Sequence, residues 1–196
     1  MSFKLNKFLA QIVVILLIFS SMAPATASTE SDAAWVTNIA KARALILKKQ
    51  FKEAETLLNS TLPQARKHKS DSNYGRYIGL MGNALFSQNK SEQMIPYAEE
   101  ALRVFYALPE SSRPQASVLF ANHSDLAISY QAQGELQKAE MQYQKAIDIA
   151  ASAPKDQIDQ NWLKICFKNL IFCLHADSLP GAEQNVREQM KKMVGD

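Results

Sequence analysis

The chain has 196 residues, of which 22 are basic and 19 acidic, so its formal net charge is +3. This near balance excludes the strong positive potential of a general nucleic-acid binder, and nucleic acid is not an expected partner. The length allows one domain with a continuous core.

The amino-terminal residues have the pattern of a secretory signal. Lys4 and Lys7 precede an almost wholly apolar stretch, residues 8–19, and the small residues at 25–27 offer a cleavage site to a signal peptidase. We therefore predict a signal peptide over residues 1–27 and a periplasmic or secreted location.

An alternative is that this segment is retained as a membrane anchor. Its apolar part, residues 8–25, reaches the lower length limit for spanning a bilayer, although Gln11, Ser20 and Pro24 interrupt it. Cleavage would leave residues 28–196 with 20 basic and 19 acidic side chains. We expect no further membrane span in that part.

Residues 35–69 predict the first pair of antiparallel helices. A turn at residues 48–50 separates two apolar stripes with helical spacing. Pro63 is expected to end or kink the second helix near Leu62, because proline lacks the amide donor. The apolar positions are Trp35, Ile39, Ala42, Leu45 and Ile46 in the first helix and Phe51, Ala54, Leu57 and Leu58 in the second.

Residues 75–108 predict a second pair. Gly82 is a small residue at the point where the two helices cross, which favours close packing. Asn89 and Glu92 have the spacing of a capping box at the start of the second helix. Pro96 predicts a bend or looser packing in that helix.

Residues 113–154 predict the third pair, and its pattern is the clearest. Ser112, followed by Pro114, has the form of a helix start near Arg113. Gly134 marks the turn, because glycine adopts positive φ without strain. The helical stripes are Leu126, Ala127 and Tyr130 before the turn and Leu136, Ala139, Tyr143, Ala146 and Ile147 after it.

Residues 157–193 predict a fourth pair, with a turn at residues 177–181. Its last helix has a thin apolar stripe and a polar outer face, which is what the end of a repeat array needs. The apolar positions are Trp162, Ile165, Cys166, Leu170, Cys173 and Leu174, then Ala182, Val186, Met190 and Met193.

The four pairs recur at a regular interval. The marker residues Ala54, Met94, Ala139 and Ala182 are separated by 40, 45 and 43 residues. The pattern of the third pair resembles the tetratricopeptide (TPR) repeat, and the long interval resembles its longer-helix, kinesin light chain-like variety. The resemblance implies an all-α, right-handed superhelical solenoid of about four antiparallel hairpins. His123 stands where the family often carries tryptophan.

The sequence contains none of the familiar phosphate-loop, hydrolase or zinc motifs, so we expect no enzyme activity, cofactor or metal. Cys166 and Cys173 are seven residues apart on one predicted helix, which is too far for a disulfide. An alternative is a thiol site formed by these cysteines with His175, but residues two apart on a helix point in different directions.

The resemblance places the binding surface in the concave groove lined by the first helix of each pair. Its mixture of cations and apolar groups would suit a peptide with acidic side chains or a free carboxylate. We therefore predict a protein or peptide partner, with a self-associating envelope scaffold as the alternative. The predicted groove residues are Arg43, Ile46, Arg76, Asn83, Phe86, Ile128, Gln131, Lys164, Phe167 and Ile171.

Overall fold

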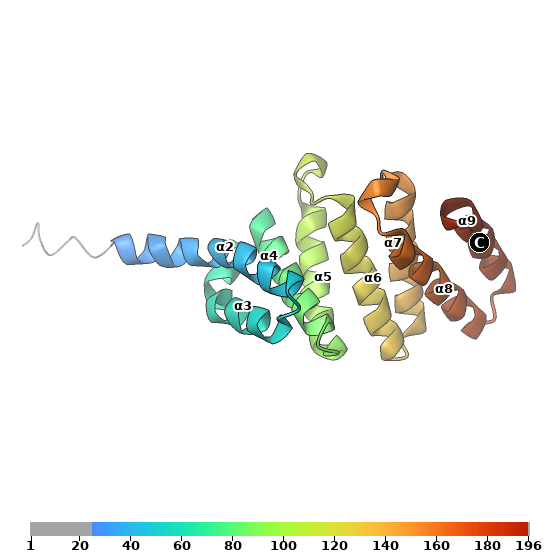
Figure 1. The fold of residues 1–196 in the computed structure, drawn as a ribbon, viewed down its shortest axis with the longest axis horizontal. Helices are drawn as coiled ribbons and strands as arrows, with labels where there is room; N and C mark the ends of the chain where they lie inside the picture. Colours follow the sequence, from blue (N-terminus) through green and yellow to red (C-terminus); the bar gives the residue numbers. More distant parts are fainter. Residues whose placement is uncertain (1–24, 196) are drawn as a thin grey trace, which may run out of the picture. The chain divides into compact units, whose positions relative to one another are not determined.

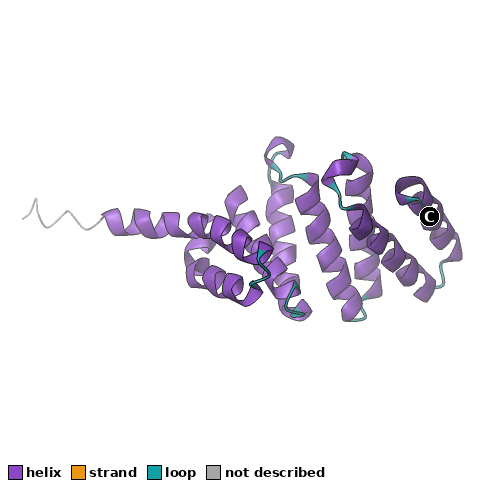
Figure 2. Ribbon diagram, in the orientation of Figure 1, coloured by secondary structure: helices purple, strands orange, loops and turns teal. Residues whose placement is uncertain are grey.

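The computed structural model describes residues 25–195, which form helices and turns with no strand among them (Figure 2). The predicted all-α class is confirmed. The chain divides into two units between Ala34 and Trp35. In the first unit the described residues are the opening turns of one helix, and the predicted signal peptide lies almost wholly outside them. The second unit contains the repeats.

Eight α-helices and three short 3₁₀ turns make up the described residues. Their bounds are α2 (Ala25–Leu47), α3 (Phe51–Ala65), η1 (Arg66–His68), α4 (Ser72–Phe86), α5 (Ser91–Ala107), η2 (Glu110–Ser112), α6 (Ala116–Ala132), α7 (Leu136–Ser152), η3 (Lys155–Gln157), α8 (Gln160–Ala176) and α9 (Pro180–Val194).

In the second unit each helix packs against the next one along the chain, from α3 to α9 (Figure 1). The first helices of the hairpins are α2, α4, α6 and α8, and the second helices are α3, α5, α7 and α9. A single cluster of buried side chains runs from Trp35 to Val186. The hairpins therefore share one continuous core, as stacked repeats must when none can bury its apolar face alone.

Each hairpin turn uses the same backbone device. One residue adopts positive φ in every turn: Lys49 (60°), Asn89 (59°), Gly134 (77°) and Ser178 (57°). The next residue then donates its N–H to a carbonyl five positions earlier, as Glu135 does to Tyr130 over 2.9 Å. This is the Schellman arrangement that satisfies carbonyls at a helix end.

Two predicted helix starts are wrong. Asn89 does not cap α5, because it occupies the positive-φ position of the turn, and Lys90 precedes the helix without a side-chain cap. Ser112 belongs to η2, and α6 begins four residues later, at Ala116. Both segments contain residues that often cap helices, but Asn89 adopts the positive φ of its turn and Ser112 lies in the 3₁₀ turn η2.

The two prolines do not end their helices. α3 continues through Pro63 to Ala65, and α5 continues through Pro96 to Ala107. Both prolines lie on the exposed side of their helix, where water can bond to the carbonyl left without a donor. Burial of Leu62 and Ala65 on the other side holds α3 in place.

Candidate peptide-binding face

The first helices of the repeats can be aligned by their buried positions. In α4, the side chains of Ile78, Met81, Gly82 and Leu85 are buried, and the residues 45 positions later, His123, Leu126, Ala127 and Tyr130, are buried in α6. The starts of α6 and α8, Ala116 and Gln160, are 44 residues apart, and that shift again matches buried residues to buried ones. The three helices therefore present equivalent faces.

One set of equivalent positions is exposed or only partly buried in all three helices. We call it the first-helix face, and its residues are Arg76, Leu80 and Asn83 of α4, Ala121, Asp125 and Ile128 of α6, and Ile165, Asn169 and Phe172 of α8. The face combines apolar and amide side chains with one carboxylate near its middle.

The α8 part of this face exposes apolar groups. Ile165 is 39% exposed and Phe172 is 55% exposed. They are seven residues apart, so they lie on the same side of the helix two turns from each other. Exposed apolar residues at such spacing are typical of helices that contact a partner.

Tyr143 of α7 extends between α6 and α8 from the side of the second helices. Its hydroxyl donates to Gln131 Oε1 over 2.6 Å and accepts from Asn169 Nδ2 over 3.0 Å. The aromatic ring is fully buried. Tyr143 therefore fills the space between two first helices and fixes an amide on each of them.

The space between α4 and α6 is filled differently. The residue of α5 equivalent to Tyr143 is Ala98, 45 positions earlier, and it leaves a cavity of about 30 Å³. The small residues Gly79, Gly82 and Ala121 also line this cavity, together with Met94 and the polar side chains of Asn83, Asn122 and Asp125. Asn83, Ala121 and Asp125 belong to the first-helix face, so the cavity adjoins that face.

Asp125 is electrostatically unusual. Burial raises its pKa from 3.8 to about 7, and burial is the only cause. No cation among the described residues therefore lies close enough to counter the cost of enclosing a carboxylate. The first-helix face thus contains a carboxylate that lacks a compensating charge.

The predicted groove residues differ in how accessible they are. Arg43 and Arg76 are exposed, Ile46 and Asn83 are partly buried, and so is Lys164, which makes a polar contact of its own. Phe86, Ile128 and Gln131 are also partly buried. Of the ten residues, only Arg76, Asn83 and Ile128 belong to the first-helix face as aligned above.

The prediction is wrong for Phe167 and Ile171. Their side chains are 0% and 8% exposed, so neither can line an accessible groove. The marker Ala182 gave an interval of 43 residues, whereas α6 and α8 start 44 residues apart. A one-residue error turns a helix by about 100°, which exchanges the buried Ile171 for the exposed Phe172.

Six residues of the face were not predicted as site residues, and Asp125 is the most informative of them. The other five would follow from aligning the buried stripes of all first helices instead of one marker in each second helix: Leu80, Ala121, Ile165, Asn169 and Phe172. Asp125 gives no such signal, because its unusual environment depends on small residues contributed by α4 and α5.

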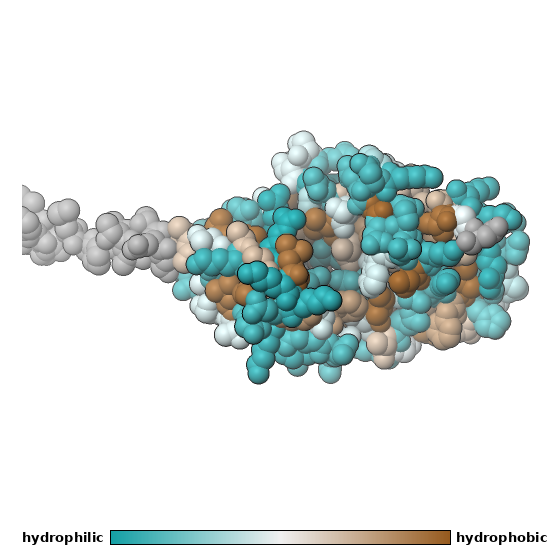
Figure 3. All heavy atoms as spheres, viewed as in Figure 1, coloured by the Kyte–Doolittle hydropathy of each residue, from teal (hydrophilic) through white to brown (hydrophobic). Residues whose placement is uncertain are grey.

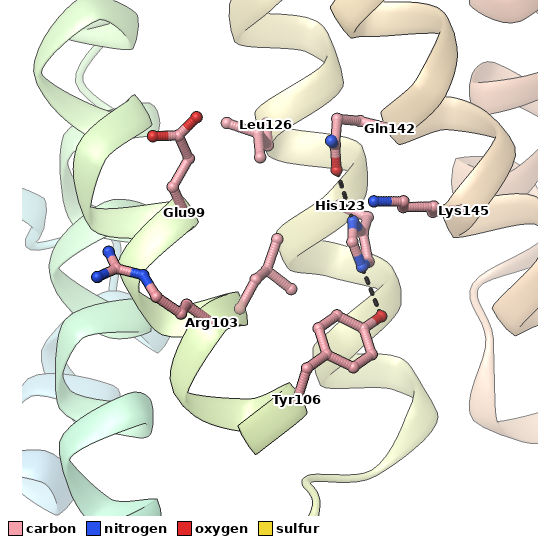
Figure 4. A pocket seen from close by; sticks show the side chains of 8 residues that line it. Glu99, Arg103, Tyr106, His123, Leu126, Gln142 and Lys145 are labelled. Atoms are coloured by element: carbon pink, nitrogen blue, oxygen red, sulfur yellow. Dashed lines mark hydrogen bonds between the residues drawn. The ribbon is translucent and has the colours of Figure 1, made fainter. Parts of the chain in front are cut away.

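A second hollow lies on the side of the second helices (Figure 4). It has a volume of about 350 Å³ and lies between α5 and α7, over α6. Its lining residues are Glu99, Leu102, Arg103, Tyr106, His123, Leu126, Gln142 and Lys145.

His123 forms the polar centre of this hollow and is 1% exposed. Its Nδ1 lies 2.7 Å from Gln142 Oε1 and its Nε2 lies 2.7 Å from the Tyr106 hydroxyl. Burial lowers the pKa of His123, which favours the neutral ring. An amide oxygen only accepts, so Nδ1 carries the proton and Nε2 accepts from Tyr106. With both nitrogens bonded, His123 is a structural residue and not an available base.

The thiol site considered as an alternative is not assembled. Cys166 and Cys173 are buried and free, and burial raises their pKa values to about 12 and about 11. His175 points to α9, where its Nδ1 lies 3.2 Å from Glu183 Oε2. The ring therefore lies at the surface beside a carboxylate, and the thiols are poorly suited to act as nucleophiles.

Among the described residues, none of the helices combines the length and the apolar character that crossing a bilayer requires. Figure 3 shows one side of the molecule, where hydrophilic residues predominate and apolar residues appear in several separate places.

Comparison with solved structures identifies the fold. BtubC (BKLC) from P. vanneervenii aligns with 83% of this chain at a TM-score of 0.65 and 16% identity. The TPR-like repeats of a putative kinesin light chain from Podospora anserina align with 81% of it at a TM-score of 0.58 and 18% identity. The chain has a TPR-like fold. The predicted resemblance to kinesin light chain-like TPR repeats is thus confirmed as a structural likeness.

This TPR-like chain matches no protein-family model and no curated protein sequence. It spans 64% of the length of BtubC and 74% of the Podospora repeat protein. At these identities the likeness establishes the architecture, and function has to be argued from the residues of this chain.

Proposed function

We propose that the protein is an exported, non-catalytic interaction module that binds a segment of another protein on its first-helix face. Export is supported by the signal-like pattern of residues 1–27. A non-catalytic role is supported by the fully bonded ring of His123 and by the buried, weakly acidic thiols of α8.

The observation that carries the proposal is the exposure of Ile165 and Phe172 on one stripe of α8, with the Asn169 amide between them. Two apolar contacts suit the side chains of a peptide, and amides on a rigid helix bond to the backbone of an extended chain. Because Tyr143 holds Asn169, that amide is already oriented before a peptide binds.

The charge of the face bears on the chemistry of the partner. Sequence reasoning favoured an acidic peptide because of Arg43, Arg76 and Lys164. In the aligned face the only one of these cations is Arg76, and the middle position of α6 is Asp125. We therefore propose a peptide with apolar side chains whose central polar group is not an acid.

The test compares two charge substitutions at equally exposed positions. Phe172 on α8 and Met141 on α7 are both 55% exposed, so Phe172→Glu and Met141→Glu should fold alike. A partner purified with the protein from envelope or secreted fractions should be lost with Phe172→Glu and kept with Met141→Glu. Equal capture by both variants would refute binding on the first-helix face.

Light scattering separates this function from self-association. A monomeric mass over a wide concentration range would remove the scaffold alternative. A dimer abolished by Phe172→Glu and not by Met141→Glu would identify the partner as a second copy of the chain.

A further inference from the structure

The cavity between α4, α5 and α6 differs from the equivalent space in the next repeat. Between α6 and α8 that space is filled by Tyr143, whose hydroxyl bonds to amides on both helices. Between α4 and α6 the equivalent residue is Ala98. Gly79, Gly82 and Ala121 also line this space, and because they have no side chain or only a methyl group they leave more of it empty. The fold therefore leaves a small vacancy at a position that Tyr143 fills in the next repeat.

The polar side chains that line the cavity differ in charge. Asn83 and Asn122 are neutral, and the Asn122 amide already donates to the Val118 carbonyl over 2.8 Å. Asp125 is the only ionisable group among the lining residues. It occupies the position that Asn169 has in α8, where the amide bonds to Tyr143. A group entering this cavity therefore meets a carboxylate that requires a donor.

We propose that the cavity takes a lysine side chain of the bound peptide and that its ammonium group pairs with Asp125. This inference rests on the proposed function and names the chemistry of its partner. A cavity of about 30 Å³ holds one or two water-sized groups. An ammonium group is of that size, whereas a planar guanidinium is larger. The apolar stem of lysine would lie along Gly79 and Ala121.

The raised pKa of Asp125 also favours a cation in the cavity. Burial raises the pKa of Asp125 to about 7, so the free protein holds a large fraction of this carboxyl protonated at neutral pH. A cation beside it stabilises the ionised form, and binding therefore releases a proton. A carboxylate or phosphate group of a ligand would be repelled from the same place.

The experiment uses n-butylammonium, which has the stem and head of a lysine side chain, as the probe. Carbon-13 NMR of the Asp125 carboxyl carbon follows its titration in the presence and absence of the probe. We expect a saturable shift and a lowering of the Asp125 pKa by at least one unit. Tetramethylammonium has the same charge but is too large for the cavity, and it should give neither effect.

A second variant tests the location. Cβ atoms built at Gly79 and Gly82 meet their nearest neighbours at 3.4 and 3.7 Å, which is ordinary contact. The variant G79A/G82A should therefore fold while the cavity closes, and its affinity for n-butylammonium should fall at least tenfold. G79A alone serves the same purpose if the double variant is unstable.

Two results would overturn the inference. Equal responses to n-butylammonium and tetramethylammonium would mean that Asp125 senses only ionic screening. Undiminished binding in the filled variant would mean that the ammonium does not enter the cavity. Either result leaves the Phe172→Glu comparison unaffected, so failure of the lysine site is distinguishable from failure of the proposed function.

Discussion

Replacing Asp125 with asparagine should stabilise the protein, and more so as the pH rises. The folded state binds a proton at Asp125 with a pKa of about 7, against 3.8 for the free side chain. The unfolded chain therefore releases this proton at lower pH than the folded chain, and stability falls between about pH 4 and pH 7. The full difference corresponds to roughly 4 kcal/mol, an upper value because Asp125 keeps some exposure.

Urea unfolding at two pH values measures this effect. From the same pKa values, the advantage of Asp125→Asn over the parent should grow by about 2.5 kcal/mol between pH 5 and pH 8. The contributions of other titrating groups, such as His123, to the pH dependence of stability cancel in this comparison because both proteins contain them. Asp156→Asn, which changes an exposed carboxylate away from the cavity, should show no such growth. An Asp125→Asn advantage that is equal at both pH values would refute the electrostatic account of this residue.

Three further predictions concern packing, reactivity and capping. Gly79→Ala should stabilise the protein by roughly 0.5–1 kcal/mol, because its Cβ makes only ordinary contacts within α4. Gly75→Ala should destabilise the protein by roughly 1–3 kcal/mol, because its Cβ would lie 2.5 Å from the buried Phe105 ring. Thermal unfolding should therefore show a raised midpoint for Gly79→Ala and a lowered one for Gly75→Ala. Cys166 should resist labelling by a thiol reagent at pH 7 in the folded protein and react fully in urea, and fast labelling of the folded protein would contradict its burial. Asp159 caps α8 through two backbone N–H groups at 2.9 and 3.0 Å, so Asp159→Ala should cost about 1 kcal/mol in urea unfolding, and an unchanged midpoint would argue against the cap.

The helical architecture was predictable because it depends on local patterns. Apolar residues at spacings of three and four place the stripes, and the hairpin breaks follow from residues such as Gly134 and Pro180. The structure reproduces the third pair closely: Ala127, Ala139 and Tyr143 are all fully buried. Such signals survive because a helix in a repeat array contacts mainly its neighbours in sequence.

The details that failed depend on tertiary structure. Pro63 is tolerated because Leu62 and Ala65 hold α3 from the buried side, which no local propensity shows. Phe167 and Phe172 have equal hydrophobicity, and only the exact register decides which one faces outward.

The charge environment of Asp125 could not be predicted from its own segment. Its cavity exists because Gly79 and Ala98, which come from two other helices, are small. A polar residue on a predicted helix is ordinarily assigned to a solvated surface, so the sequence alone indicates nothing unusual at this position.

Site-specific photocrosslinking tests the central claim most directly. Benzoylphenylalanine incorporated at Phe172 of α8, or at the equally exposed Met141 of α7 as a control, reports which face the partner contacts in cells. A partner crosslinked from position 172 and not from position 141 is the result that binding on the first-helix face predicts. Crosslinks from position 141 alone would place the partner on the second helices and contradict the account.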